Sequence, residues 1–217
     1  MLRPLQHLLE TIYDARSGQD VRDFLLTRRH QLPAERRAHA ADEEVVLIDA
    51  RREIHLGVYI DAAVLERLQA SDPLRCLTGA NLADFLTALE GVSHFIYLTW
   101  NARHDRGVSQ LELELQAEVD KYVASWWLLR RQHPRHLPRE LHHVLFRRAR
   151  IDESMDRSRR DLYAAATHCA ARFCTRLESA LSSNRPALHR TALTALRRFY
   201  RLGSLSKQHH GWCQAGA

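Results

Sequence analysis

The chain has 217 residues, of which 45% are hydrophobic and 27% are charged. This composition is that of an ordinary globular protein, so it excludes wholesale disorder, and the length allows one large domain with a core of its own. No apolar run approaches the roughly 18 to 20 residues that a membrane span needs. Glu10 and Asp14 interrupt the apolar part of the N-terminal segment, which argues against a signal peptide.

The cysteines indicate the cellular compartment of the protein, and the net charge indicates the kind of partner that it favours. The four cysteines have no C-x-x-C spacing, and a chain of this length does not need disulfides, so we expect a cytoplasmic protein. The net charge of +6 favours anionic partners. Lysine occurs only at Lys121 and Lys207, however, and such an arginine bias is also produced by genome base composition.

The N-terminal third predicts helices and a hairpin. Apolar positions at the 3.6-residue period predict a helix over residues 3–15. Asp20 is a typical N-cap, so we expect a second, short helix over residues 21–29. Residues 44–60 carry a β-branched run followed by strict alternation, which predicts an antiparallel β-hairpin with one face packed on helices. Asp61 caps the helix that follows it.

The centre of the sequence predicts a pair of long helices. Residues 81–127 form two amphipathic segments separated by the polar turn at residues 104–107. Gly91 lies inside the first segment and costs roughly 1 kcal/mol relative to alanine, so it predicts a kink or a close helix crossing. Ser109, followed three residues later by Glu112, is a capping-box pattern that opens the second segment.

The C-terminal half completes a mainly helical protein. Helices are expected over about residues 139–150, 155–181 and 186–203, with prolines at the starts of the first and last and Gly203 as the final stop. The segment 204–217 has no pattern and is expected to be a tail. We therefore predict a mainly α (α+β) fold, a bundle of about seven helices around the central pair with one antiparallel hairpin, in a single domain over residues 1–203.

Acidic residues on the central pair are the most specific feature of the sequence. Glu90 and His94 are four residues apart on the first helix, and Glu114 and Glu118 are four apart on the second, so each pair shares one side of its helix. Helical bundles build metal sites from carboxylates and histidines that project inward in this way. A divalent-metal site is therefore one hypothesis, although the Glu-x-x-His and Glu-x-x-Glu sets of known helical metal enzymes are not complete here.

Other interpretations of the same residues stay open. Glu118 falls inside the apolar arc, where an acid must be neutralised or partnered by an arginine, histidine or tyrosine. Glu112 is most simply a capping residue. His94 lies about 140° from the centre of its helix's apolar face, so Glu90 and His94 could be an exposed pair and Glu114 a solvated acid at the rim.

A row of arginines marks the last predicted helix. Arg190, Arg197 and Arg201 fall within about 40° of one another, opposite the apolar stripe, and Lys207 follows in the expected tail. Such a row can contact phosphate groups, and a solvated helix face is the other interpretation.

No motif of a common enzyme class is present. The sequence lacks a Gly-rich phosphate loop, a G-x-S-x-G elbow, H-E-x-x-H and zinc-finger spacing. We therefore expect a non-catalytic binding or accessory protein with no cofactor, which docks a protein partner or an anionic ligand through its arginine-rich surface. The first alternative is a metal-dependent helical-bundle enzyme acting on a phosphorylated or nucleotide substrate. The second is a nucleic-acid-binding protein.

Overall fold

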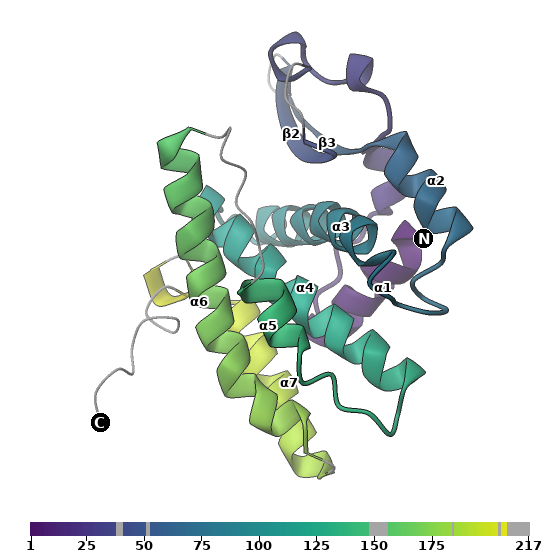
Figure 1. Cartoon of the computed structure of the whole chain (residues 1–217). Coiled ribbons are helices and arrows are strands. Elements are labelled where there is room, and N and C mark those ends of the chain that lie inside the picture. The colour runs from purple at the N-terminus through teal and green to yellow at the C-terminus, as the bar shows by residue number, and fades with distance from the viewer. Residues whose placement is uncertain (38–40, 51–52, 148–155, 184, 204, 208–217) are drawn as a thin grey trace.

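The computed structural model of the chain describes residues 1–37, 41–50, 53–147, 156–183, 185–203 and 205–207. The predicted fold class, a mainly helical bundle with a small sheet, is confirmed (Figure 1). Within the described residues no helix has both the length and the apolar character needed to cross a bilayer. The α-helices are α1 (Leu2–Tyr13), α2 (Ala62–Ala70), α3 (Leu82–Ala102), α4 (Gln110–Gln132), α5 (Leu141–Phe146), α6 (Arg157–Leu181) and α7 (Pro186–Tyr200). The strands are β1 (Leu25–Leu26), β2 (Glu43–Ala50) and β3 (Glu53–Ile60), and short 3-10 turns lie at η1 (Val21–Phe24), η2 (Arg29–Gln31) and η3 (Ala34–Arg36).

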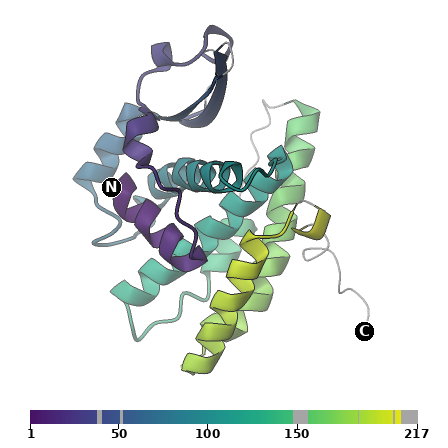
Figure 2. The same ribbon diagram turned by 180° about the vertical axis from the view of Figure 1, so that it is seen from behind.

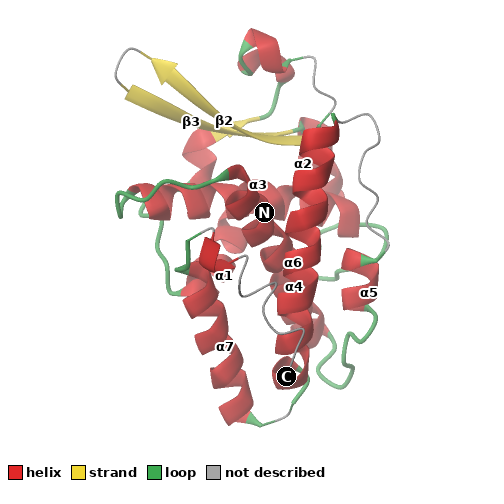
Figure 3. Cartoon of the chain, turned by 90° about the vertical axis from the view of Figure 1, so that its left-hand side faces the viewer, coloured by secondary structure: helices red, strands yellow, loops and turns green. Residues whose placement is uncertain are grey.

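Helix α3 is the element that the others surround. It contacts α1, α2, α4 and both long strands, and it lies below the sheet and above α1, α4, α5 and α7 (Figure 3). Helix α6 runs along α4, and α7 packs against both α6 and α1. Seen from behind, α1 and α7 cover the opposite side of the bundle (Figure 2). The central pair predicted from residues 81–127 is therefore α3 with α4.

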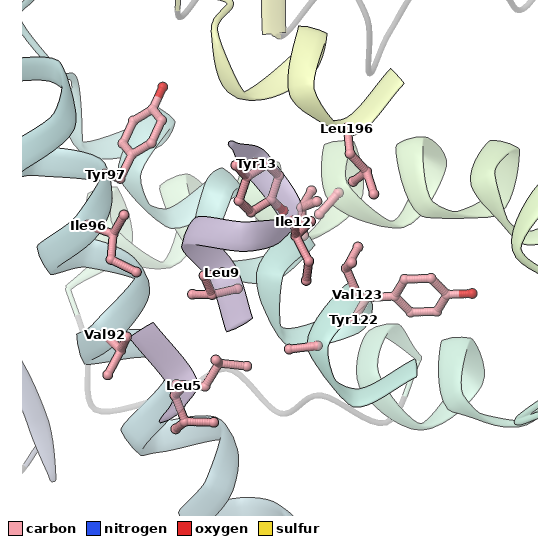
Figure 4. Close-up of a cluster of buried hydrophobic side chains, with 14 of the residues drawn as sticks. Leu5, Leu9, Ile12, Tyr13, Val92, Ile96, Tyr97, Tyr122, Val123 and Leu196 are labelled. Carbon is pink, nitrogen blue, oxygen red and sulfur yellow. The ribbon is translucent and has the colours of Figure 1, made fainter. Parts of the chain in front are cut away.

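One apolar core joins these helices. Leu5, Leu9 and Ile12 form the inward stripe of α1, and they meet Val92 and Ile96 of α3 together with residues of α4 and α7 (Figure 4). These side chains are almost completely buried. Each contributes on the order of 1.5–3 kcal/mol relative to an exposed position.

Local capping sets the starts of several helices, whereas α5 is shorter than the predicted helix over residues 139–150 and begins at Leu141. The side chains of Asp20, Asp61 and Ser109 accept backbone N–H groups at the starts of η1, α2 and α4. Asp156 does the same at the start of α6, and Pro186 occupies the first turn of α7. The four capping side chains satisfy N–H groups that have no partner inside their helix, and Pro186 lacks such an N–H group altogether. Of the expected tail, only residues 205–207 are described.

The sheet contains one strand that the sequence did not predict. Strands β2 and β3 form the expected antiparallel hairpin, with Glu43 opposite Ile60. The helix predicted over residues 21–29 is wrong beyond Phe24, because Leu25 and Leu26 pair in parallel with β3 as β1. Tertiary pairing here overrides the local helical pattern.

Both faces of the hairpin are covered near its base, whereas we predicted packing on one face. Val58 belongs to the main core, and Tyr59 points to the other side, where it packs with Leu32 and Val46 in a second, smaller cluster. The β1 segment and its following turns supply that second cover.

Gly91 is the point at which α3 and the hairpin come closest. A Cβ atom at this position would lie 3.1 Å from Val58 Cγ1 and 3.2 Å from Glu43 Cγ. The glycine therefore permits α3 to cross a pair of strands, so the close approach at this residue involves strands rather than a second helix. The close approach also brings the Glu43 side chain onto α3.

Replacing this glycine tests the close approach. Gly91→Val is expected to lower the free energy of unfolding by about 1–3 kcal/mol, because the new side chain overpacks against Val58 and Glu43. Gly79→Val is the matched control, since no atom lies within 4 Å of a Cβ there, and its effect is expected to stay within about 0.5 kcal/mol. Denaturant unfolding of both variants measures the difference, and equal effects would contradict the crossing.

Candidate metal centre

The interface between α3 and α4 contains ionisable side chains at depths where apolar ones are usual. His94, Glu112, Glu114 and Asp120 are all buried there. A buried charge costs several kcal/mol unless it is paired and hydrogen-bonded. Each of these groups must therefore have a partner, and the partners divide into two clusters.

His94 is the centre of the first cluster. Its side chain is 4% exposed, with Nδ1 3.3 Å from Glu43 Oε1 and Nε2 3.6 Å from Glu114 Oε2. Burial disfavours the charged imidazole, but the carboxylates of Glu43 and Glu114 outweigh it and raise the pKa of His94 well above its usual value. Burial raises the pKa of Glu43 to about 7, against the opposing charge of His94.

Glu90 brings a third carboxylate to His94 and Glu114. Glu90, His94 and Glu114 each offer one potential ligand atom, and these three atoms lie within 4.8 Å of one another. Glu90 Oε2 also lies 2.8 Å from Lys121 Nζ. Burial opposes ionisation of Glu90, yet Lys121 and His94 prevail and lower its pKa.

Lys121 is the second cation of this cluster. Its ammonium lies 2.8 Å from both Glu90 Oε2 and Glu118 Oε1. Burial penalises this charge, but the two carboxylates prevail and raise the pKa of Lys121. The ammonium is therefore a fixed positive charge between α3 and α4.

The first cluster carries more negative than positive charge. Its carboxylates are Glu43, Glu90, Glu114 and Glu118, and its cations are His94 and Lys121. When all are ionised, two negative charges are uncompensated within the cluster. In addition, His94 Nε2 is buried and has no hydrogen-bond partner among the described residues. The surplus carboxylate charge would be satisfied by a bound cation, and Nε2 of His94 would bind that cation after releasing its proton.

The structure brings together three of the four residues that the sequence nominated for this site. Glu90, His94 and Glu114 converge, so the alternative of an exposed Glu90–His94 pair is wrong. Glu118 lies at the edge, with its side chain 16% exposed, and its partner is Lys121 rather than an arginine, histidine or tyrosine. Glu43 and Lys121 were missed, although the rarity of lysine in the chain was a usable signal for Lys121.

The second cluster lies between the same two helices, and its residues Ser93 and Asp120 directly precede His94 and Lys121 of the first cluster. The Asp120 carboxylate accepts hydrogen bonds from the hydroxyls of Tyr13 and Ser93 and from the Gln116 amide. Lys207 Nζ donates to Gln116 Oε1 at 2.8 Å and lies 4.2 Å from the centre of the Tyr97 ring. Lys207, in the segment expected to be a tail, is therefore completely buried.

Glu112 belongs to this second cluster as well as to a helix cap. Its backbone N–H donates to Ser109 Oγ, as the capping pattern predicted, and its carboxylate accepts the Tyr97 hydroxyl at 2.8 Å. Burial lowers the pKa of Lys207 to about 7, although the charges of Glu112 and Asp120 oppose this shift. Burial also raises the pKa of Asp120 to about 6, against its hydrogen-bond donors.

Two of the three nominated arginines bond to another helix. Arg197 donates to the carbonyls of Thr11 and Ile12, and Arg201 donates to those of Tyr13 and Asp14. These carbonyls lie at the C-terminal end of α1, where helix carbonyls lack partners within the helix. Arg190, by contrast, is exposed on α7.

Comparisons with protein families, curated proteins and solved structures find no match for this chain.

The buried lysine predicts a pH dependence of stability. Because the pKa of Lys207 falls from 10.5 to about 7 on folding, the unfolded chain binds more protons between these pH values. The free energy of unfolding contributed by this group therefore rises with pH across that window, by at most about 1.4 kcal/mol per pH unit. Lys207→Met removes this contribution.

Denaturant unfolding of the original protein and of Lys207→Met at roughly pH 7 and 9 isolates the effect, since all other groups are shared. The original protein is expected to gain stability relative to the variant at the higher pH. A difference between the two proteins that does not change with pH would contradict the buried, proton-poor lysine.

Proposed function

We propose that this protein binds a single divalent transition-metal ion at Glu90, His94 and Glu114, while Glu43 accepts a hydrogen bond from Nδ1 of the same imidazole and orients it. The observation that carries the proposal is the buried His94 Nε2, which has no hydrogen-bond partner among the described residues and faces a carboxylate 3.6 Å away. Donor atoms bound to one ion lie at most about twice a 2.1 Å bond apart, so small rotamer changes would close the 4.8 Å set around it.

The donor types favour manganese, iron or zinc. One imidazole nitrogen with several carboxylate oxygens suits these ions, whereas an all-oxygen set would favour calcium or magnesium. The cluster contains no thiolate ligand among the described residues. Mixed carboxylate and histidine sites between the helices of a bundle are a recurrent way to hold such ions.

The position of Lys121 supports one ion rather than two. Its ammonium lies between Glu90 and Glu118, at hydrogen-bond distance from each. That is the place which a second cation would need in a bridged pair of metals. The lysine already supplies the charge there.

Metal analysis and ligand substitution test the proposal. Untagged protein is expected to bind one equivalent of Mn²⁺ or Zn²⁺ in calorimetry, and His94→Gln and Glu114→Gln are each expected to weaken binding by at least about 100-fold, since even second-shell changes cost 10- to 100-fold. Glu118→Gln is the comparison variant, because this carboxylate pairs with Lys121 outside the ligand set, and its loss of affinity is expected to be smaller than that of the two ligand variants.

Circular dichroism establishes that each variant is folded before binding is measured. Folded protein that binds no stoichiometric metal would exclude the proposal. So would a Glu118→Gln variant that loses as much affinity as the two ligand variants.

The docking of an anionic partner is a second candidate function. Its support is a groove of about 510 Å³ along α7, whose lining residues include Phe173 and Phe199 as well as Arg190 and Arg198. Arginine presents a fork of donors that suits carboxylates. We propose that this groove receives an acidic segment of a protein partner.

A short polyglutamate peptide is the probe for the groove. Fluorescence anisotropy is expected to show binding at low salt that weakens as salt increases, and a double variant, Arg190→Glu with Arg198→Glu, is expected to abolish it. Binding unaffected by the double variant would exclude the groove. Stronger binding of an oligonucleotide that also depends on both arginines would instead favour the nucleic-acid alternative.

A further inference from the structure

A further groove lies at the C-terminal end of α4, where the loop of residues 133–140 joins α4 to α5 (Figure 1). Its volume is about 550 Å³, within the range of roughly 300–1,000 Å³ that is usual for sites of small molecules. Residues 77–82, which lead into α3, form one wall, and α4, the loop and α5 form the other. We call it the α4–α5 groove.

Most of the side chains that line the α4–α5 groove are apolar. Leu82, Leu129, Leu137 and Val144 are only half-buried, so part of their apolar surface reaches water in the groove. Contiguous apolar surface is costly to leave in water, and on a folded protein it commonly marks a binding site. The groove therefore suits a ligand with an apolar body.

Polar side chains hold both walls of the groove in place. The Gln132 side chain accepts a hydrogen bond from the Leu77 N–H at 2.8 Å, which ties the end of α4 to the opposite wall. The Arg130 guanidinium donates to the carbonyls of Pro134 and His136 and so fixes the loop on α4. The groove is therefore already formed, and a ligand does not have to order its walls.

The charge around the groove favours an anion. Residues 130–140 contain a single acid, Glu140, which lines the groove, and four arginines, namely Arg130, Arg131, Arg135 and Arg139. His133 and His136 also belong to the lining, and residues 77–82 carry no charge. The surroundings of the groove are therefore net basic and attract a negatively charged group.

We propose that the α4–α5 groove binds a medium-chain carboxylic acid, with the alkyl chain against the leucines and the carboxylate beside the basic loop. Its volume and its two walls suit a single alkyl chain, whereas protein partners usually dock on larger surfaces. This site is separate from the candidate metal centre, because Leu129 and Glu114 lie roughly 22 Å apart along α4, at about 1.5 Å per residue.

Calorimetry at low salt, with octanoate and decanoate as probes, tests the class of ligand on untagged protein. Decanoate is expected to bind at one site and about 15-fold more tightly than octanoate, since each buried methylene adds about fourfold in affinity. Protonated decylamine has the same chain and the opposite charge. It is expected to bind at least about tenfold more weakly than decanoate.

Gly79→Trp tests the location of the site. Gly79 lines the groove, and no atom lies within 4 Å of a Cβ at this position, so an indole can occupy the groove without displacing other residues. The variant is expected to weaken decanoate binding by at least about tenfold. Leu137→Asp, which places a second acid in the groove, is expected to have the same effect.

Gly107→Trp is the matched control. A Cβ at Gly107 also has no atom within 4 Å, but this glycine lies in the turn between α3 and α4 and does not line the groove. Its affinity for decanoate is expected to stay within about twofold of the original. Circular dichroism establishes that each variant is folded.

Four results would overturn the proposal. The first is no binding of decanoate, and the second is equal weakening by Gly79→Trp and Gly107→Trp. The third is decylamine binding as tight as that of decanoate. The fourth is a different occupant, shown by a dimer of the original protein, or by tighter binding of an amphipathic helical peptide, that Gly79→Trp abolishes and Gly107→Trp does not.

Discussion

Charge balance inside the α3–α4 interface is the constraint on which the rest of the structure depends. Two helices that meet through buried carboxylates are stable only if cations enter the same space. The chain has two lysines, Lys121 and Lys207, and both lie in this interface. A compact ammonium fits between two acceptors more easily than a planar guanidinium does. Arginine, which is abundant, serves elsewhere, for example at the C-terminal end of α1.

The two clusters are coupled because their members alternate along the same helices. Ser93 and Asp120 belong to one cluster, and the next residues, His94 and Lys121, belong to the other. A rotation of α3 or α4 that improved one cluster would disturb the other. The core around them is aromatic and apolar and is built from α1, α3, α4 and α7 (Figure 4). It therefore has a second role besides the burial of apolar surface. It fixes the rotation of both helices and so holds the proposed metal ligands close together, which would limit the cost of ordering them around an ion.

The helices could be predicted from local sequence signals. The site could be predicted only in part, because it also depends on contacts between residues that are far apart in the sequence. Caps such as Asp61 and the 3.6-residue period depend on neighbours in sequence, which is why α2, α3 and α4 begin where expected. The i, i+4 spacing of Glu90 and His94 was likewise visible. Glu43 could not be found in this way, since only tertiary packing across Gly91 brings a strand to α3. The wheel position of His94 was misleading for the same reason, because β2 covers a helix face that an isolated bundle would expose to water.

The contribution of Glu43 from a strand rather than a helix has a consequence for how the chain must fold. Side chains alternate between the two faces of a strand, so a shift of β2 by one residue against β3 would turn Glu43 away from α3 and present Asp42 or Glu44 in its place. The pairing of Glu43 with Ile60 is held by β1 on the far edge of β3 and by the packing of Val58 against α3. The register of β2 against β3 therefore determines which carboxylate faces α3. The hairpin thus determines the chemical groups of the site as well as covering it.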